Sequence, residues 1–169
     1  MQYLEDIDFV VAGLDSDGNA IFIDPPRRPS HVVGDALETT FFWSARPPLR
    51  FPDEMGGESR GVAEMAPGES RFGLVCFPPR SAGKLDLRDA RPGSEYDPPD
   101  MDRAMHATET IDYEVILSGK VDFKLSNGDM RTLTAGTCLV VTGAMHAWSN
   151  PYDEPCIVSF VAVRIGRNG

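Results

Sequence analysis

The residues best suited to chemistry lie just past the middle of the chain, where every second position is polar. The run starts at His106 and continues through Thr108, Thr110, Asp112 and Glu114. Alternate side chains of an extended strand point to the same face, so one face here carries an imidazole, two hydroxyls and two carboxylates. Such a set could hold a divalent metal ion or move protons on a substrate. We predict that this face lines a polar pocket; a solvated face is the alternative.

A second histidine segment follows further along the chain. His146 comes after a turn at Gly143, and Trp148 and Asn150 share its strand parity. We expect His146 to be a metal ligand or an acid/base group; the alternative is a ring satisfied by a backbone carbonyl. Trp148 and Asn150 are candidate ligand-binding residues, and the indole N–H of Trp148 could face the pocket. A small β-barrel brings two such segments together at one inward-facing site.

The rest of the sequence predicts the strands that position these residues. Apolar, β-prone runs separated by turn residues at intervals of roughly 8–12 residues indicate a sandwich or barrel. Residues 15–19 and 127–128 are strong turn sequences, so we expect hairpins there. Strands are expected over residues 9–12, 20–23, 39–43, 71–77, 113–119, 120–125, 130–134, 137–141 and 156–163. The prediction is an all-β fold in which the last strand, a near-continuous apolar run, is buried on both faces.

Three stretches are unlike strands. Residues 24–29 are rich in proline and cannot form helix or central strand, because proline lacks an N–H donor. Residues 46–69 are rich in Pro, Gly and Glu and are expected to form irregular surface or a lid. Residues 80–103 are a long polar stretch, and loops of that length are uncommon unless they are functional or mobile.

The spacing of the polar residues resembles the two motifs of the cupin superfamily. The first motif here runs His-x-Thr, three residues, Asp, six residues and Gly119; the second runs Gly-x-x-His-x-x-x-Asn and ends at Asn150. The sequence looks like small single-domain bacterial cupins whose first motif reads Met-His-x-Thr-x-Thr-x-Asp-Tyr and whose second ends His-Ala-Trp-x-Asn. The resemblance implies a jelly-roll β-barrel in one domain. Residues 1–103 would supply a hairpin, an arm and the first barrel strands, and residues 104–169 the motif-bearing core.

The resemblance also implies a pair of subunits, since small cupins commonly form homodimers. Jelly rolls expose edge strands. We expect the N-terminal hairpin to cover such an edge, either in its own subunit or across the dimer.

Thr108 stands where the cupin motif has its second histidine. The ligands that the resemblance carries over are His106, Asp112 and His146, a set like that of non-haem Fe(II) oxygenases. Fe, Mn, Ni or Zn could use it. The alternative is a pocket that has lost its metal and binds an organic ligand with the same polar groups, including Thr108 and Thr110. A buried Asp112 would then need hydroxyl donors or a raised pKa.

Three functions fit these residues. The first is a small-molecule enzyme, a metal-dependent oxygenase or decarboxylase of an aromatic, polyketide-like or small carboxylic substrate, in which Glu114 or Tyr113 assists with protons. The second is a metal-free isomerase, cyclase or dehydratase with His146 and Asp112 as the acid/base pair. The third is a non-catalytic module that binds a small molecule.

Residues outside the two motifs could extend the site. His31 could complete a three-histidine site if the N-terminal arm reached the barrel; a solvated loop histidine is the alternative. Arg50 and Arg71 could each bind a substrate carboxylate bidentately, and a surface charge is the alternative for both.

Composition narrows the class of partner. The 169 residues include 16 Lys and Arg against 26 Asp and Glu, a formal net charge of −10, which disfavours nucleic acid. We expect no nucleotide cofactor. No apolar run approaches the length of about eighteen residues that spans a membrane, and the N-terminus lacks the pattern of a signal peptide. We therefore expect a cytoplasmic protein whose three cysteines are core filler in a reduced compartment.

Overall fold

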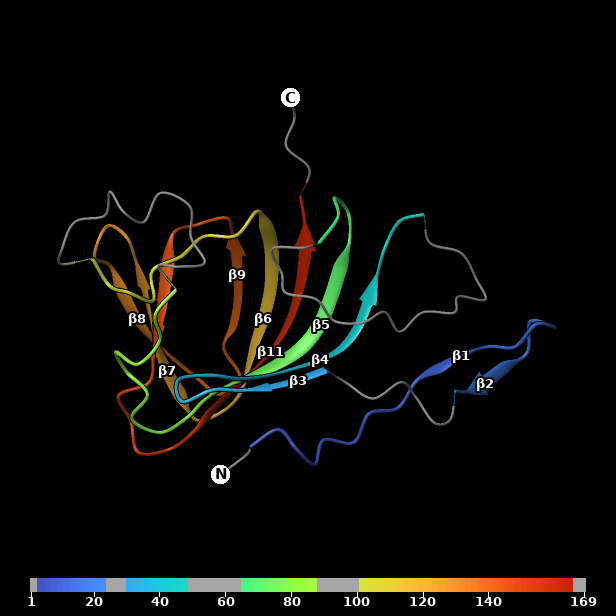
Figure 1. Cartoon of the computed structure of the whole chain (residues 1–169), viewed down its shortest axis with the longest axis horizontal. Coiled ribbons are helices and arrows are strands. Elements are labelled where there is room, and N and C mark those ends of the chain that lie inside the picture. The colour runs from blue at the N-terminus through green and yellow to red at the C-terminus, as the bar shows by residue number, and fades with distance from the viewer. Residues whose placement is uncertain (1–2, 24–29, 49–64, 88–100, 166–169) are drawn as a thin grey trace.

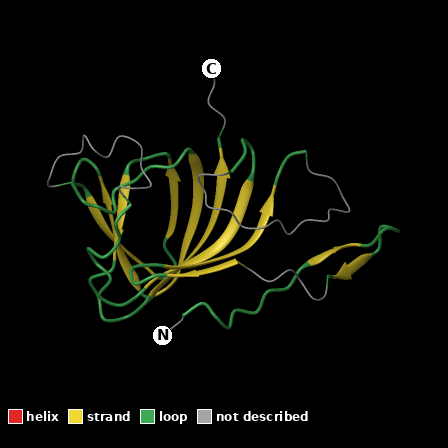
Figure 2. Ribbon diagram, viewed as in Figure 1, coloured by secondary structure: helices red, strands yellow, loops and turns green. Residues whose placement is uncertain are grey.

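The computed structural model describes residues 3–23, 30–48, 65–87 and 101–165, and these form strands and turns without a helix (Figures 1 and 2). The strands are β1 (Ala12–Leu14), β2 (Ala20–Phe22), β3 (Ser30–Val33), β4 (Glu38–Ala45), β5 (Ser70–Phe77), β6 (Thr110–Ser118), β7 (Lys120–Leu125), β8 (Met130–Thr134), β9 (Cys138–Thr142), β10 (His146–Ser149) and β11 (Cys156–Arg164). In the described part of the chain, nothing helical is long and apolar enough to span a bilayer.

These strands form two sheets and a separate hairpin. The larger sheet has six antiparallel strands in the order β3-β4-β5-β11-β6-β9, and the smaller has the order β10-β7-β8. The C-terminal strand β11 thus lies between β5 and β6, a crossing typical of double-sheet jelly rolls. Figure 1 shows the six-stranded sheet curving so that one of its sides faces β7 and β8. The all-β jelly-roll prediction is confirmed.

The main core fills part of the space between the two sheets. Its buried residues come from both sheets: Phe77, Ile116, Val121, Phe123, Leu133, Val141, Trp148, Cys156 and Val158. Along β6 the same inner face changes character. Ile116 is 1% exposed and belongs to the core, whereas Glu114 and Asp112 line a cavity with polar groups. The barrel interior is therefore apolar in one part and polar in the next.

A second apolar cluster lies on the outer side of the large sheet, where the N-terminal arm packs. The ring of Phe9 lies 5.1 Å from that of Phe42, centroid to centroid, and 6.4 Å from that of Trp43. The carboxylate of Glu38, 1% exposed, accepts hydrogen bonds from the backbone N–H groups of Tyr3 (2.8 Å) and Leu4 (2.7 Å). These contacts fix residues 3–9 against β4.

Gly119 turns the chain from β6 into β7 and cannot be replaced without strain. Its φ is +69°, a conformation that residues with a Cβ rarely adopt. A Cβ there would also lie only 2.1 Å from the carbonyl oxygen of Pro155. The glycine of the first motif is thus required both by the turn and by the close approach of another segment.

Most predicted strands are present, with shifted ends. The hairpin over 7–23 is confirmed, although its strands cover only Ala12–Leu14 and Ala20–Phe22. One strand, Ser30–Val33, was not expected, and it is polar at its start. The strand His146–Ser149 was implied only by the shared parity of His146, Trp148 and Asn150. Residues 156–163 form the predicted strand, but the predicted burial on both faces is only partial, because just three of the nine residues of β11 are buried. Residues 24–29 and most of 46–69 and 80–103 lie outside the described residues.

Candidate active site

The predicted polar face lines a cavity of about 230 Å³ between the two sheets. Its polar wall carries His106, Thr108, Asp112, Glu114 and His146. The other walls are mostly apolar: Leu37, Thr39, Phe41, Val75, Phe77, Leu85, Leu87, Trp148, Phe160 and Ala162. The two motif segments therefore meet, as predicted, at one inward-facing site.

Backbone pairing brings the two histidines together. His106 and His146 form an isolated antiparallel bridge in which each backbone N–H donates to the other carbonyl at 2.8 Å. Their ring centroids lie 4.4 Å apart. His106 Nδ1 lies 2.9 Å from the carbonyl oxygen of Ala104, and His146 Nδ1 lies 2.7 Å from that of Ala144. A carbonyl only accepts, so each Nδ1 carries a proton; in a neutral ring the lone pair is then on Nε2.

His146 is held as a neutral base. It is 4% exposed, and its ring stacks on Phe123 at a centroid distance of 4.9 Å. Burial lowers the pKa of His146 to about 4, against the hydrogen bond to Ala144, which raises it; the positive field of His106 lowers it further. At neutral pH the Nε2 lone pair of His146 is therefore free to accept a proton or a hydrogen bond.

Asp112 receives its hydrogen bond through a relay of two hydroxyls. Thr110 Oγ1 donates to Asp112 Oδ2 at 3.0 Å, and Thr108 Oγ1 lies 2.6 Å from Thr110 Oγ1. Because Thr110 has only one hydroxyl proton, Thr108 must be the donor to Thr110. Burial raises the pKa of Asp112, although hydrogen bonds from Thr110 and Thr108 and the field of His106 oppose the rise. For a buried Asp112 without a metal, the sequence analysis expected either hydroxyl donors or a raised pKa, and both occur here.

Glu114 is the most strongly perturbed group of the cavity. Its Oε2 atom is buried and accepts no hydrogen bond. Burial, followed by the negative field of Asp112, raises the pKa of Glu114 to about 8. At neutral pH it is mainly a protonated acid, with a carboxyl proton available to a bound molecule.

The predicted metal ligands line one cavity but do not assemble as a ligand set. No group of three or more His, Cys, Asp or Glu side chains that could hold an ion occurs in the described ranges. Asp112 is engaged by Thr110 on the large sheet, whereas His146 belongs to the small sheet. An aspartate side chain is also one methylene shorter than the glutamate of the usual motif. As they stand, His106, Asp112 and His146 do not fit a three-ligand metal centre.

Of the other candidate site residues, one lines the cavity and two do not. Trp148 lines the cavity and stacks on Phe77 at a centroid distance of 5.3 Å. Asn150, 1% exposed, instead bonds the backbone, since its Nδ2 donates to the carbonyls of Phe77 (2.8 Å) and Glu154 (2.9 Å). Tyr113 is 52% exposed and lies outside the cavity, because adjacent residues of a strand point to opposite faces. The geometry therefore gives Asn150 a structural place and does not bring Tyr113 to the site.

The outlying candidates do not join the cavity either. His31 Nδ1 lies 2.7 Å from Thr40 Oγ1, and its Nε2 lies 3.4 Å from Glu38 Oε1, on the outer side of the large sheet. Arg71 is not a surface charge, since it is 2% exposed and pairs with Glu69 at 3.1 Å. Arg50 lies outside the described residues.

The apolar walls are what sequence reasoning missed. Val75 and Phe77 share the inner face of β5, and Phe160 and Ala162 share that of β11. Strand parity could have found them, because the strands themselves were predicted; the sequence did not say which face turned inward. Leu85 also lines the cavity, so the start of the stretch 80–103 does reach the site.

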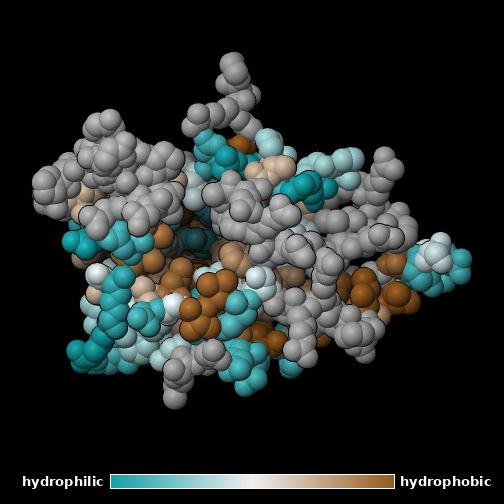
Figure 3. Space-filling view, in the orientation of Figure 1, coloured by the Kyte–Doolittle hydropathy of each residue, from teal (hydrophilic) through white to brown (hydrophobic). Residues whose placement is uncertain are grey.

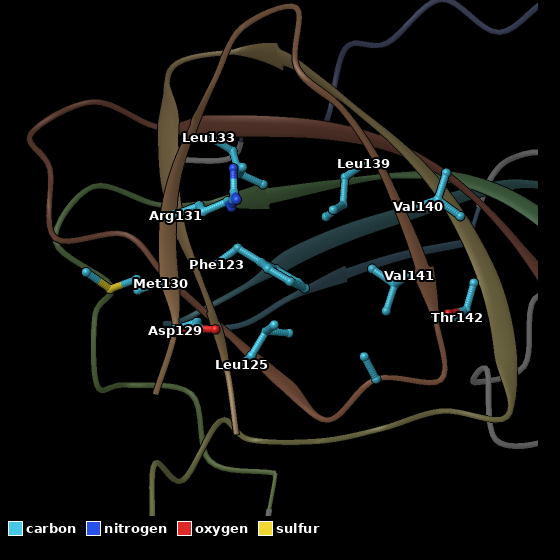
Figure 4. A pocket seen from close by; sticks show the side chains of 11 residues that line it. Phe123, Leu125, Asp129, Met130, Arg131, Leu133, Leu139, Val140, Val141 and Thr142 are labelled. Carbon is cyan, nitrogen blue, oxygen red and sulfur yellow. The ribbon is translucent and has the colours of Figure 1, made fainter. Parts of the chain in front are cut away.

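A second, larger cleft of about 680 Å³ lies between β8 and β9. Figure 4 shows Phe123 reaching into the middle of it, with Leu125 to one side and Leu139 and Val141 opposite. The cleft is mainly apolar and none of the paired acid and base groups lines it. The candidate acid and base groups therefore lie in the smaller cavity.

One relative is named for the class of protein that the sequence motifs resemble. A cupin-domain-containing oxidoreductase of Neurospora crassa is 24% identical over 147 residues, which cover 85% of this chain and 66% of that protein. Two phomopsin biosynthesis cluster proteins of Diaporthe leptostromiformis, C' and D, are each 41% identical over 66 residues, covering 39% of this chain. The chain is similar to cupin-domain proteins. Its match spans less than a third of the two phomopsin cluster proteins, at 31% of their length.

Solved cupins also resemble the chain at low identity. An RmlC-like cupin of Shewanella frigidimarina has a TM-score of 0.47 and 13% identity, with 83% of this chain and 86% of that chain covered. A Cupin 2 barrel protein of Salinispora arenicola has a TM-score of 0.46 and 13% identity, with 79% and 80% covered. No family model matches the chain. The resemblance to bacterial single-domain cupins stays a prediction.

Proposed function

We propose that the chain is a cupin enzyme that carries out acid–base chemistry, without a metal, on a small and largely apolar organic molecule. The observation that carries this proposal is that a buried imidazole and a buried carboxyl group without a hydrogen-bond partner line one cavity, in surroundings that shift their pKa values in opposite directions. His146 stays neutral above a pH of about 4, and Glu114 stays protonated below a pH of about 8. Paired groups whose environments push their pKa values apart are typical of acid–base active sites.

The proposed step moves one proton in each direction. His146 Nε2 takes a proton from a carbon next to a substrate carbonyl, and Glu114 gives its carboxyl proton to an oxygen of the substrate. In a dehydration the C–H and C–O bonds break, a C=C bond forms and water leaves. In an isomerisation the carbonyl oxygen is protonated and an enol forms; His146 then gives its proton to another carbon of the enol system, and the enol O–H proton returns to Glu114. After a dehydration His146 carries the extra proton, which returns to Glu114 to restore the starting state.

The proposed acid–base pair, His146 and Glu114, differs in one member from the pair expected from the sequence, which was His146 and Asp112. Asp112 was the expected partner of His146, but its carboxylate already accepts from Thr110, whereas Glu114 Oε2 has no partner. An unpartnered buried carboxyl group is costly unless a ligand satisfies it. We therefore assign the acid role to Glu114 and give Asp112 the role of raising the pKa of Glu114 through its charge.

The substrate class follows from the walls of the cavity. Aromatic side chains of Phe41, Phe77, Trp148 and Phe160 surround the polar groups, which suits a flat, apolar or aromatic molecule with few polar atoms. The phomopsin cluster proteins are named for the biosynthesis of a natural product. We propose that the substrate here is likewise an intermediate of natural-product synthesis that carries a carbonyl group.

The test uses protein stripped of metal with a chelator and a panel of aryl ketones and β-hydroxy aryl ketones in D₂O. Mass spectrometry follows deuterium uptake next to the carbonyl and loss of water. We expect one or both with the stripped protein, unchanged by added chelator, and a large fall in both in His146→Gln and in Glu114→Gln. Tyr113→Phe is the matched control, because it neighbours Glu114 but lies outside the cavity.

Two outcomes would contradict the proposal. If the probes bind but are not converted, the chain is a binding module. If conversion requires added Fe(II), Mn(II), Ni(II) or Zn(II), the reaction needs a metal.

A metal-dependent oxygenase or decarboxylase is the second candidate, favoured by one observation. Both histidines have Nδ1 tied to a backbone carbonyl, as metal-binding histidines usually do. A relative is also named an oxidoreductase. Elemental analysis of protein purified without chelator tests it: less than about a tenth of a metal ion per chain, without gain on adding the four metals, would eliminate this candidate.

A further inference from the structure

The larger cleft, between β8 and β9, opens where hydrogen bonds do not close the barrel. β8 is the end strand of the small sheet and β9 is the end strand of the large one, and the two do not pair. The cleft has a volume of about 680 Å³, within the range of about 300–1,000 Å³ that small-molecule sites usually have. Figure 3 shows the surface hollowed between the two sheets, with brown, hydrophobic residues along the margin of the hollow.

The floor of this cleft is apolar because inward-facing positions of three strands meet there. The side chains are those of Phe123 and Leu125 on β7, Leu133 on β8, and Leu139 and Val141 on β9. Leu125 and Leu139 pack against the main core but are only partly buried. Their remaining apolar surface would leave water if an apolar ligand lay over it, which is favourable.

Arg131 is the exception on this inner surface. The register places it opposite Phe123, and it shares its strand face with Leu133, so its side chain leaves β8 on the inner side. Figure 4 shows Arg131 entering the cleft beside Leu133, whereas Met130 points away from it. Arg131 takes part in none of the ion pairs among the described residues. A charged side chain normally belongs on the solvated face of a strand, so this guanidinium is placed to meet an anion inside the cleft.

Asp129 is the other charge that lines the cleft, and it does not pair with Arg131. Its Oδ2 atom accepts a hydrogen bond from Asn127 Nδ2 at 2.8 Å, and its backbone N–H donates to Asn127 Oδ1 at 3.0 Å, so the turn holds it. The chain has a formal net charge of −10, which repels anions unless a local cation attracts them. A guanidinium suits a carboxylate best, because it can bind both oxygens at once.

The cleft is distinct from the cavity that holds the acid and base groups. Within the described ranges the two share no lining residue. Phe123 stands between them: it lines the cleft, and its ring lies 4.9 Å from that of His146 and 4.8 Å from that of Trp148, centroid to centroid. A molecule in the cleft therefore meets Phe123 rather than the catalytic candidates.

We propose that the cleft between β8 and β9 is a second small-molecule site, which takes a carboxylate attached to a single apolar chain. The carboxylate pairs with Arg131, and the chain lies over Phe123, Leu125 and Leu139. This site does not depend on the proposed reaction, because neither His146 nor Glu114 takes part in it.

The experiment titrates decanoate, at concentrations where it is monomeric, into the full chain by calorimetry at neutral pH. We expect one site per chain. Arg131→Gln should weaken decanoate binding by about tenfold or more, because a charge-assisted hydrogen bond is lost, and should leave the binding of neutral decan-1-ol unchanged. Lys124→Gln is the matched control: it also removes a cation from the small sheet, but from the face opposite to Phe123 and Arg131, and it should change neither affinity.

The apolar part of the site is tested by changing the ligand, which leaves the fold undisturbed. In the series from decanoate to hexanoate, the affinity should fall about fourfold for each methylene removed, the equivalent of one buried CH₂ group. Nuclear Overhauser contacts then locate the bound chain. We expect them between the decanoate methylenes and the methyl groups of Leu125, Leu133 and Leu139.

Several outcomes would overturn the proposal. A native protein that does not bind decanoate, or that binds hexanoate equally well, would show that the cleft is not a site for an apolar chain. Unchanged binding in Arg131→Gln, or an equal loss in Lys124→Gln, would remove Arg131 as the partner of the carboxylate. Contacts to Phe160 or Ala162 instead of the three leucines would place decanoate in the smaller cavity. Conversion of the ketone probes is measured separately, so a failure of this site and a failure of the proposed function are distinguishable.

Discussion

The two faces of β6 are reversed relative to an ordinary strand of a β-sandwich. Towards the barrel interior the strand presents Thr110, Asp112 and Glu114, and towards the outside Tyr113, Val115 and Leu117. A half-buried strand normally places apolar groups inside and polar groups outside. The polar interior is the part that we propose as a reaction site, whereas the exterior leaves apolar side chains such as those of Tyr113 and Leu117 exposed.

The comparison also separates two energetic situations. The inner carboxyl groups lie in a place where burial raises their pKa values, so the cavity holds groups that are unfavourable without a ligand. The outer side chains of Tyr113 and Leu117 leave apolar area in water that association would remove. Changes on the inner face should therefore alter activity and pH dependence, and changes on the outer face should alter assembly.

The largest effect is expected from His146→Gln. Glutamine keeps a polar group of similar reach but cannot act as a base, so turnover of the ketone probes should fall by about 10²- to 10⁴-fold. Steady-state rates against the native protein measure this, with binding of the same probe checked by calorimetry. Retained turnover would show that His146 does not act as the base, and the inner face would lose its catalytic explanation.

The next largest effect is expected on the pH dependence of turnover, in which Glu114 should set the upper limit. Native turnover should be lost as the pH rises through about 8, where Glu114 loses its proton, and again as the pH falls through about 4, where His146 gains one. Glu114→Gln should reduce turnover and remove the limb near pH 8 while leaving the acid limb. An unchanged upper limb in this variant would assign that limb to another group.

Stability should also depend on pH through the same residue. The folded-state pKa of Glu114, about 8, lies above its ordinary value of 4.5, so the folded chain binds more protons than the unfolded chain between these values. The contribution of Glu114 to the free energy of unfolding is therefore largest below pH 4.5 and is lost progressively as the pH rises to 8. Comparing urea unfolding of the native protein and Glu114→Gln at pH 5 and pH 8 measures it. We expect the native protein to lose more stability across that interval than the variant does; equal losses would place the effect elsewhere.

On the outer face, Tyr113→Glu provides the counterpart to Glu114→Gln at the adjacent position. It places a charge on an uncharged face and should weaken, by about tenfold or more, any self-association of the full chain through that face, as analytical ultracentrifugation would measure. Turnover per chain, measured well above the dissociation constant, should stay the same because Tyr113 lies outside the cavity. If instead turnover fell and assembly did not, the two faces of β6 would have exchanged roles.

The sequence predicts the inner face well because strand parity and turn residues act locally. The alternation from His106 to Glu114 and the glycine at 119 placed five polar side chains on one face, and four of them line the cavity. What the sequence could not supply was long-range, above all that His106 pairs with His146 through the backbone; the hydroxyl donor of Asp112 is two residues away on the same strand and was expected. Such pairings depend on how far the two sheets approach, which no local pattern encodes.

On the outer face of the large sheet, the sequence shows the residue types but not what packs against them. Its apolar residues are visible in the sequence, and the run in residues 156–163 was interpreted as burial on both faces. The residues on the outer side of β11 are only partly buried, since the arm ends over β4 and β5. Composition thus indicates that a face is meant to be covered, but it does not identify what covers it.

The smallest effect tests the hydroxyl relay behind the inner carboxylates. Thr110→Val keeps the shape of the fully buried side chain but removes the donor to Asp112 Oδ2. Leaving that carboxylate without its donor should reduce the free energy of unfolding by about 1–3 kcal/mol. It should also raise the pKa of Asp112 further, so the loss should be smaller at a pH where Asp112 is protonated. Thr39→Val, on the apolar side of the same cavity, is the matched control. Urea unfolding of the native protein and both variants is compared at neutral pH and at a pH low enough to protonate Asp112. A loss independent of pH, or equal in the control, would mean that Thr110 contributes by packing, and that the polar inner face of β6 does not depend on the relay.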